Sequence, residues 1–371
     1  MREGETASDM TGPDETVTAR PRKGRGAVTN RTGRFEPETR AAVDDDWPGD
    51  GEPPPPLRTT LSVDTARRVI TYNKSPDIPF DRSINPYRGC EHGCVYCFAR
   101  PTHAYYGLSP GLDFETRLFY KPDAAALLRR ELRETGYRPA TIAMGTNTDP
   151  YQPVERETGL TRAILQVLQE YRHPVSIVTK STLILRDVDI LADMARQRMA
   201  SVCISVTTLD RRLARLMEPR APTPARRLET IETLNAAGVP TGALVAPIIP
   251  ALNDMEIDRI VAALAAAGAV SAGYVLLRLP LEIKDLFEEW LGTHYPKRKN
   301  HVMSLIRQTR DGAAYRAEWG ARMRGTGPYA DLIKQRFVLA LRRHGLVRRS
   351  LDLDVSSFRP PPAPGDQLSL L

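Results

Sequence analysis

The residues best suited to chemistry are three cysteines that lie close together in the chain. The stretch SINPYRGCEHGCVYCFAR contains Cys90, Cys94 and Cys97, and the whole chain of 371 residues has only four cysteines. Few, clustered cysteines argue against a disulfide framework, and in an intracellular chain such a cluster more often binds metal or takes part in catalysis. The spacing Cys-x3-Cys-x2-Cys therefore predicts a metal centre.

Two kinds of metal centre fit three thiolates on one short loop. Zinc takes four ligands, with each cysteine sulfur about 2.3 Å away, and His92 within the loop could be the fourth. A cubane iron–sulfur cluster takes one cysteine per iron, so three cysteines leave the fourth iron open to another ligand. An open coordination position is typical of catalytic sites. The spacing favours an iron–sulfur cluster, with zinc as the alternative.

The segments after the cysteines alternate between strand and helix patterns. Short apolar runs predict buried strands, and apolar residues at helical spacing predict helices. This alternation is typical of a parallel sheet with helices packed outside it, and active sites of parallel barrels lie at the carboxyl ends of the strands. The predicted strands are 140–146, 174–181, 200–208, 240–250 and 273–280, and the predicted helices are 161–171, 187–198, 224–238 and 254–268.

The two ends of the chain differ in composition from this α/β region. Residues 1–55 are rich in Gly, Pro, Thr, Asp and Arg, so they cannot bury enough apolar surface to offset chain entropy, and we expect a disordered N-terminal segment. Residues 281–355 have helical patterns, and we expect 326–355 to form a helical C-terminal extension. The proline-rich residues 356–371 are expected to form a flexible tail.

Composition and charge are those of a globular protein. The chain has 41% hydrophobic and 26% charged residues, and its net charge of +7 is compatible with nucleic acid as a partner. The N-terminal residues MREGETASDM lack the apolar region of a secretory signal, and no run approaches the roughly eighteen apolar residues of a membrane span. We therefore expect a cytoplasmic protein without a membrane segment.

The residues around the cysteines resemble those of a known family. Cys90, Cys94 and Cys97, with the aromatic Tyr96 directly before the third cysteine, are similar to the signature of radical S-adenosylmethionine (SAM) enzymes. Three longer strings resemble the subgroup near spore photoproduct lyase, which is often labelled DNA-repair-photolyase-like. These strings are NPYRGCEHGCVYCFAR, GTNTDPYQPVE and SVTTLD.

The resemblance implies a fold and a reaction. The fold would be a partial (β/α)6 barrel of the TIM type over residues 76–325, with a [4Fe–4S] cluster at its mouth. The open iron would be chelated by the amino and carboxylate groups of SAM. One electron, supplied by a donor of the flavodoxin or ferredoxin type, would pass through the cluster and cleave the sulfonium C–S bond. The resulting 5′-deoxyadenosyl radical would abstract hydrogen from a substrate held close to it.

Polar side chains on two predicted strands are candidates for holding SAM. Alternate residues of a strand share a face, so Cys203, Ser205 and Thr207 lie together, and we assign Ser205 and Thr207 to the nucleoside end of SAM. Hydroxyls bonded to neighbouring backbone are the alternative. Lys180 falls at the end of a predicted strand, and a buried lysine needs an anionic partner. Lyases of the resembled subgroup bind the methionyl carboxylate with a lysine, which implies this role for Lys180; a surface lysine is the alternative.

The loop GTNTD follows another predicted strand. In the resembled superfamily this loop receives the amino group of SAM through backbone carbonyls and nearby polar side chains, so Thr146, Asn147 and Asp149 are candidates. The alternative is turn formation, because Asn, Thr and Asp are common in turns. Tyr151 and Glu155 could line the substrate side.

The fourth cysteine marks a departure from the resembled subgroup. Enzymes like spore photoproduct lyase carry an additional cysteine near the second strand as a hydrogen donor, whereas this chain has Gly145 and Thr146 there. Cys203 could face the cavity, although a buried free cysteine usually acts as a small hydrophobic residue. The departure argues against thymine-dimer reversal as the reaction.

Two further stretches concern partners. Residues 211–227 carry six arginines on the predicted active face, which could contact the phosphates of DNA or another nucleic acid; a solvated surface is the alternative. The last five residues, QLSLL, resemble the peptide that bacterial proteins insert into the sliding clamp. In that interpretation Gln367 forms hydrogen bonds, and Leu370 and Leu371 fill a pocket.

Three hypotheses of function follow from the sequence. The first is a radical SAM enzyme, lyase-like or modifying, that repairs or modifies nucleic acid. The second keeps the radical chemistry and gives it a peptide or small-molecule substrate. The third is a non-enzymatic zinc protein that binds nucleic acid.

Overall fold

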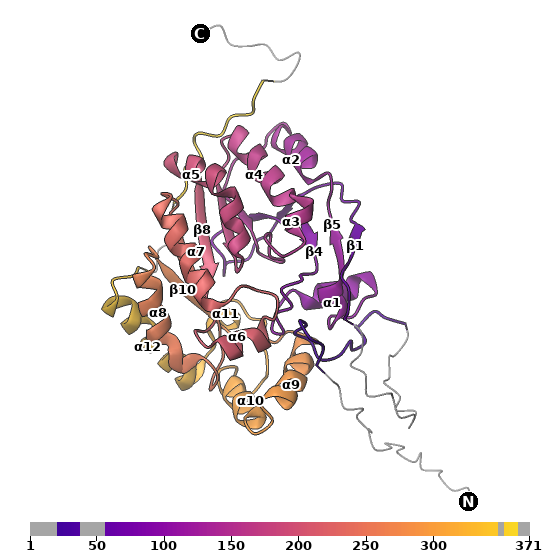
Figure 1. Cartoon of the computed structure of the whole chain (residues 1–371), viewed down its shortest axis with the longest axis vertical. Coiled ribbons are helices and arrows are strands. Elements are labelled where there is room, and N and C mark those ends of the chain that lie inside the picture. The colour runs from indigo at the N-terminus through magenta and orange to yellow at the C-terminus, as the bar shows by residue number, and fades with distance from the viewer. Residues whose placement is uncertain (1–20, 38–55, 348–351, 363–371) are drawn as a thin grey trace, which may run out of the picture.

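A seven-stranded sheet forms the centre of the molecule. The computed structural model describes residues 21–37, 56–347 and 352–362 (Figure 1). The strand order in the sheet is β10-β9-β8-β7-β6-β3-β2, and every neighbouring pair is parallel except β2 and β3. The strands are β2 Ile70–Tyr72, β3 Arg82–Ile84, β6 Ile142–Met144, β7 Val175–Thr179, β8 Ala200–Ser205, β9 Thr241–Ile248 and β10 Ala272–Leu276.

Six parallel strands, β3 and β6 to β10, lie side by side in the order in which the chain visits them. This is the arrangement of a partial (β/α)6 barrel, and within the described residues the sheet stays open, with β10 and β2 at its edges. The α/β class that the sequence predicts is therefore confirmed. Four of the five predicted strands contain an observed strand, and the fifth, 273–280, overlaps β10, which begins one residue earlier at Ala272. β2 and β3 are short strands that the apolar pattern does not reveal.

Helices connect the parallel strands and cover the sheet (Figure 1). Neighbouring helices contact one another, α2 with α4, α4 with α5, α7 with α8, and α8 with α12. Helix α7 begins with Pro224 in its first turn, where the missing N–H of proline costs nothing, and it is followed by Gly238 at a φ of 78°. The helices are α2 Ala124–Leu132, α4 Leu160–Glu170, α5 Val188–Arg196, α7 Pro224–Ala236, α8 Ile257–Ala266 and α12 Gly327–Arg343.

The main core lies between the sheet and these helices. Strand residues such as Ile204 and Val245 pack with helix residues such as Ile164 and Leu234, and all four are fully buried. Burying one such side chain contributes about 1.5–3 kcal/mol. Because strand side chains alternate, the packing of Ile204 toward the helices leaves its neighbours to face the other side of the sheet.

A second, smaller sheet and several short elements complete the fold. The small sheet has the order β1-β5-β4, and the cysteine loop follows β4. Helices α9 and α10 pack together after the last strand of the main sheet. These elements are β1 Thr60–Val63, β4 Tyr87–Arg88, β5 Arg117–Tyr120, η1 Arg100–Tyr106, α1 Asp113–Thr116, α3 Glu155–Thr158, η2 Thr182–Asp187, α6 Arg211–Met217, η3 Asp254–Glu256, α9 Ile283–His294, α10 Lys299–Gln308 and α11 Ala321–Arg324.

Part of the N-terminal segment packs on the domain, so the expected disorder across residues 1–55 is wrong for residues 21–37. The backbone N–H groups of Gly26 and Ala27 donate to the carboxylate of Glu115 at 2.9 and 2.8 Å. The expectation weighed only apolar burial, whereas this segment is held by hydrogen bonds to a buried carboxylate. Residues 1–20 and 38–55 lie outside the described part.

The C-terminal helix belongs to the main core. Helix α12 falls within the predicted extension 326–355, and its residues Ile333 and Phe337 are buried in the main core cluster. The N–H of Ala272 donates to Val347 O at 3.0 Å, next to a parallel bridge that adds residue 347 to the edge of the sheet. The candidate clamp peptide Gln367–Leu371 lies outside the described residues.

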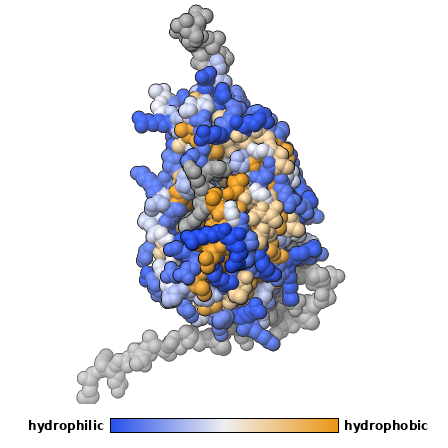
Figure 2. Space-filling view, turned by 90° about the vertical axis from the view of Figure 1, so that its left-hand side faces the viewer, coloured by the Kyte–Doolittle hydropathy of each residue, from blue (hydrophilic) through white to orange (hydrophobic). Residues whose placement is uncertain are grey.

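The face of the molecule drawn in Figure 2 is mostly polar. Figure 2 shows the side that carries α8 and α12, where hydrophilic residues dominate and hydrophobic residues gather toward the middle. None of the helices in the described part of the chain is both long enough and apolar enough to cross a membrane.

Candidate active site

The cysteine loop lies at the carboxyl edge of the main sheet, between β4 and η1. Its residues contact the segments that follow three parallel strands. The ring of His92 faces Asp149 after β6, the ring of Tyr96 lies 5.9 Å from the Lys180 Nζ after β7, and the Tyr96 hydroxyl is 3.4 Å from Thr207 Oγ1 after β8. The loop therefore occupies the position where the sequence places an active site.

The three thiols are free and largely shielded from water. Cys90 and Cys94 are 7% and 8% exposed, and Cys97 is partly exposed. Burial raises the pKa of each of the three thiols above its ordinary value. Since metals bind the thiolate, loading this loop must displace protons, and binding will be tighter at higher pH.

The donor set fits an iron–sulfur cluster. His92, the fourth ligand that the zinc alternative needs, is 2% exposed and its Nδ1 lies 3.3 Å from an oxygen of Asp149. No three His, Cys, Asp or Glu side chains of the described residues surround one point as the ligands of a single ion would. A cubane cluster spreads its cysteines over different irons, so the thiols need not converge on one atom.

Asp149 joins the cysteine loop to the ends of β6 and β7. Its carboxylate accepts hydrogen bonds from Thr179 Oγ1 at 2.6 Å and from the N–H groups of Tyr151 and Lys180 at 2.9 Å each. Burial alone would raise the pKa of Asp149, but His92 and the hydrogen bonds lower it to about 2. Both oxygens are therefore engaged within the protein, and Asp149 is placed to position the loop.

The side chain of Asn85 holds the segment around Thr146 and Asn147 through hydrogen bonds. Asn85 accepts from the N–H of Asn147 at 3.1 Å and donates to Thr146 Oγ1 at 3.4 Å. Gly145 has a φ of 83°, and a Cβ there would lie 1.9 Å from Val178 O. Glycine is thus required at position 145, near the place where the resembled lyases carry a further cysteine.

Lys180 lies beside Tyr96 of the cysteine loop, and Ser205 ends the neighbouring strand β8. The side chain of Lys180 is 15% exposed, and its Nζ is 3.9 Å from a carboxylate oxygen of Glu218. Burial lowers the pKa of Lys180, and the thiol of Cys94 opposes that shift. Ser205 ends β8 and is 4% exposed. Among the described residues its hydroxyl forms no hydrogen bond.

Thr207 belongs to a buried network that sequence reasoning missed. Its hydroxyl donates to Glu218 Oε1 at 2.6 Å, and the same carboxylate accepts from the hydroxyl of Tyr96 and the guanidinium of Arg227. Burial raises the pKa of Glu218, and the charge of Arg227 opposes this. The only signal in the sequence was a single acidic residue within an arginine-rich stretch.

That arginine-rich stretch divides into two groups. Arg227 pairs with Glu218, and Arg220 pairs with Glu91 of the cysteine loop at 3.1 Å. The other group is exposed to solvent and consists of Arg211, Arg212 and Arg215 on α6 and Arg226 on α7. The first group positions the site, and the second is available to contact a partner.

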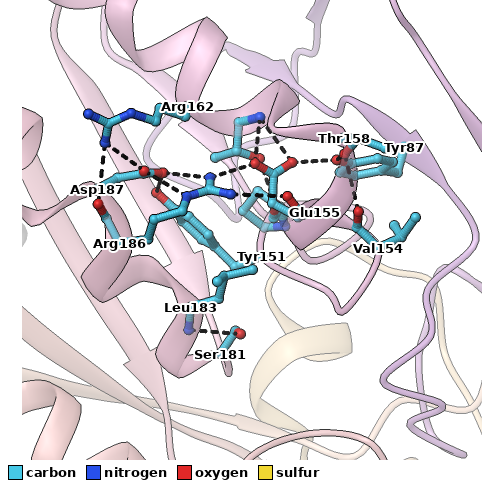
Figure 3. Close-up of polar contacts among 12 residues, drawn as sticks. Tyr87, Tyr151, Val154, Glu155, Thr158, Arg162, Ser181, Leu183, Arg186 and Asp187 are labelled. Carbon is cyan, nitrogen blue, oxygen red and sulfur yellow. Dashed lines mark hydrogen bonds and ion pairs between the residues drawn. The ribbon is translucent and has the colours of Figure 1, made fainter.

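Tyr151 and Glu155 form another buried network, shown in Figure 3. Both side chains are fully buried, and the Tyr151 hydroxyl donates to Asp187 Oδ2 at 3.1 Å. Glu155 accepts from Arg186 at 2.6 Å and from the hydroxyl of Tyr87. These residues tie the β6–α4 connection to η2, so the idea that Tyr151 and Glu155 line a substrate cavity is wrong.

Residues 21–37 of the N-terminal segment pack against the cysteine loop. Arg100, fully buried, donates to Cys94 O at 2.8 Å and pairs with Glu115, which also binds the segment. A Cβ on Gly26 would lie 1.7 Å from Gly93 O, within the loop. The approach is so close that only glycine fits.

Replacing Gly26 with alanine should loosen the cysteine loop. The added methyl group must push Gly93 or the segment aside, and such overpacking costs about 1–3 kcal/mol or more. We expect a lower urea midpoint and less iron per chain after anaerobic reconstitution. Gly292→Ala is the matched control, because its Cβ would meet only ordinary contacts at 3.9 Å. Equal iron content in Gly26→Ala and the unaltered protein would refute the role of this contact.

A partial parallel barrel with a three-cysteine loop at its carboxyl edge is the architecture of radical SAM enzymes. The sequence profile of the radical SAM superfamily matches residues 84–264. The chain belongs to the radical SAM superfamily, which implies an enzyme that uses SAM and an iron–sulfur cluster. The predicted family is confirmed.

Its relatives include proteins from bacteria and archaea. An uncharacterized protein of Mycobacterium tuberculosis (strain ATCC 25618 / H37Rv) is 40% identical over 241 residues, which are 64% of this chain and 71% of that protein. An uncharacterized protein of Methanocaldococcus jannaschii is 29% identical over 191 residues, 52% of this chain and 68% of that protein.

Among solved structures, spore photoproduct lyase shares the fold. Its complex with dinucleoside spore photoproduct has a TM-score of 0.52 and 14% identity, and the match covers 76% of this chain and 79% of that chain. A mutant of the lyase with bound AdoMet and dinucleoside spore photoproduct has a TM-score of 0.50 and 15% identity, with 76% and 78% covered. The predicted likeness to this lyase is confirmed at the level of fold.

Proposed function

We propose that this radical SAM enzyme repairs or modifies nucleic acid, with a [4Fe–4S] cluster held by Cys90, Cys94 and Cys97. The observation that carries the proposal is the three-cysteine loop at the carboxyl edge, with Lys180 beside it. Exposed arginines on α6 favour a nucleic-acid substrate over a peptide or small molecule. The likeness in fold to a lyase solved with a dinucleoside lesion supports the same substrate class.

The residues of the chain have distinct tasks in this proposal. When bound, the reduced cluster supplies one electron that splits the C–S bond of SAM into methionine and a 5′-deoxyadenosyl radical. Lys180 donates to the carboxylate of SAM, and Glu218, 3.9 Å away, keeps its ammonium group aimed at the site. The burial of Cys90 and Cys94 keeps water from the reacting atoms.

The remaining candidates take supporting parts. We assign the segment of Thr146 and Asn147 to the amino group of SAM and Ser205 to its nucleoside. Thr207 and Asp149 are positioning residues, because their side chains are already bound to Glu218 and Thr179.

Two partners belong to the proposal as well. A donor of the flavodoxin or ferredoxin type would reduce the cluster. The peptide Gln367–Leu371 would bind a bacterial sliding clamp, and its sequence alone supports this assignment.

Anaerobic reconstitution tests the proposed chemistry. We expect the protein loaded with iron and sulfide to give the EPR signal of a reduced cubane, and to form 5′-deoxyadenosine and methionine from SAM when dithionite is added. Removal of the iron with a chelator, or omission of dithionite, should stop product formation. Purified protein that carries zinc in this loop and does not cleave SAM would refute the proposal.

A further inference from the structure

An arginine lies beside the cysteine loop at the end of β10. The Cζ of Arg278 is 5.0 Å from the ring centroid of Phe98, the residue after Cys97. Phe98 is 46% exposed although it is apolar and adjacent to the predicted cluster. The pair therefore places a cation and an open aromatic face at the edge of the active site.

The guanidinium of Arg278 has few partners in the protein. Its Nε is buried and forms no hydrogen bond with any described residue. The two Nη atoms make only long contacts of 3.5 Å, to Met323 Sδ and to the hydroxyl of Tyr315. A guanidinium has five N–H donors, so most of the capacity of Arg278 is unused.

A second arginine lies behind the first. Arg310 is 1% exposed, and it donates to the carbonyls of Ala321 at 2.5 Å and Leu277 at 2.9 Å, while its Nε is buried without a partner. Burial and the charge of Arg278 lower the pKa of Arg310 to about 10. Two like charges close together in a buried setting raise the free energy unless an anion joins them.

No carboxylate of the described residues neutralises this pair. Asp77 is close enough for its pKa to respond to Arg278, but its carboxylate binds Arg322 Nε at 2.5 Å and the N–H of Gly320 at 2.6 Å. Neither Arg278 nor Arg310 forms an ion pair with a described residue. The positive charge of the pair is therefore not balanced by an ion pair within the described residues.

We propose that Arg278, backed by Arg310, binds a phosphate group of a single-stranded nucleic acid substrate beside the cysteine loop, with a base stacked on the exposed ring of Phe98. This inference rests on the proposed function. A guanidinium binds phosphate through paired hydrogen bonds, and an exposed aromatic ring is a stacking platform for a base. Arg310 acts as a positioning residue, because it holds Leu277 O and adds charge without reaching the ligand itself.

The site is tested by measuring how tightly the protein binds a labelled oligothymidylate of twelve nucleotides at several salt concentrations. Arg278→Gln should weaken binding about tenfold at moderate salt and reduce the slope of log K against log salt by about 0.7, the value for one lost phosphate contact on a single strand. Phe98→Leu should weaken binding with the slope unchanged, since stacking involves no counterion. Arg196→Gln, at an exposed position on α5, is the charge-matched control and should change neither quantity.

A second pair of probes separates a strand from a free nucleotide. Thymidine 5′-monophosphate should compete with the labelled oligonucleotide more weakly than the unlabelled oligonucleotide does. In the unaltered protein it should also compete better than thymidine, and in Arg278→Gln this difference between nucleotide and nucleoside should disappear. Failure of the unaltered protein to bind the strand, or an unchanged slope in Arg278→Gln, would overturn the inference. The inference would also be overturned if Arg278→Gln weakened the binding of a peptide or a free nucleotide more than it weakened the binding of the oligonucleotide. SAM cleavage without substrate, measured in the same preparations, reports separately on the proposed function.

Discussion

Replacing Cys94 with alanine should abolish the formation of 5′-deoxyadenosine by the reconstituted and reduced protein. The cluster needs one thiolate for each of three irons and an open fourth iron for SAM. With one thiolate missing, a second iron lacks its protein ligand. The reduction potential of the cluster then changes, and SAM is no longer directed to a single iron. The measurements are iron per chain, the EPR signal after reduction, and the yield of product from SAM.

Cys203 provides the matched control for this experiment. It is on β8 and not in the three-cysteine loop, so it is not one of the three proposed ligands. Cys203→Ala should therefore keep the cluster and the cleavage of SAM. Loss of cleavage in Cys203→Ala together with its retention in Cys94→Ala would reverse the assignment of the ligands.

Replacing Arg227 with methionine should be the most destabilising change away from the cysteines. Arg227 is 2% exposed, and its guanidinium pairs with the fully buried carboxylate of Glu218. Removing one partner of a buried ion pair leaves an uncompensated charge and costs about 3–5 kcal/mol. We expect this loss in the free energy of unfolding at pH 7, measured with urea on the protein without its cluster.

The pH dependence of this variant has a definite sign. Glu218 without Arg227 has a pKa raised further above 4.5, so the folded state binds more protons than the unfolded state. The loss in the free energy of unfolding of Arg227→Met should be largest above the pKa of Glu218 in the folded variant, and it should shrink as the pH falls toward 4.5. Adding Glu218→Gln to Arg227→Met should recover part of the loss, because no buried charge remains. A double variant less stable than Arg227→Met would contradict this explanation.

Local patterns predicted the parts of the fold that depend on local sequence. The strand β8 and the helix α4 have strong periodicity over many residues, and both were predicted. The cysteine spacing likewise identifies the loop without any tertiary information. β2 and β3, three residues each, are too short for a period to be visible.

The missed parts of the site depend on contacts between distant residues. The Arg227 guanidinium reaches Glu218 across a loop, and Tyr96 reaches the same carboxylate over 122 residues of chain. A composition argument counts charges but cannot pair them. For this reason the sequence predicts a phosphate-binding surface at residues 211–227, and it gives no signal for Arg278, which lies outside any basic run.

The contact between Gly26 and Glu115 joins residues 89 positions apart, and this has a consequence for maturation. During synthesis the N-terminal segment leaves the ribosome first, but it has nothing to bind until Gly93 and Glu115 have folded. Domains with such separated contacts close them late, because the entropy of the intervening chain opposes early closure. We therefore expect the thiols to be accessible to an iron donor before the segment closes, and we expect the closed segment to slow the escape of a bound metal.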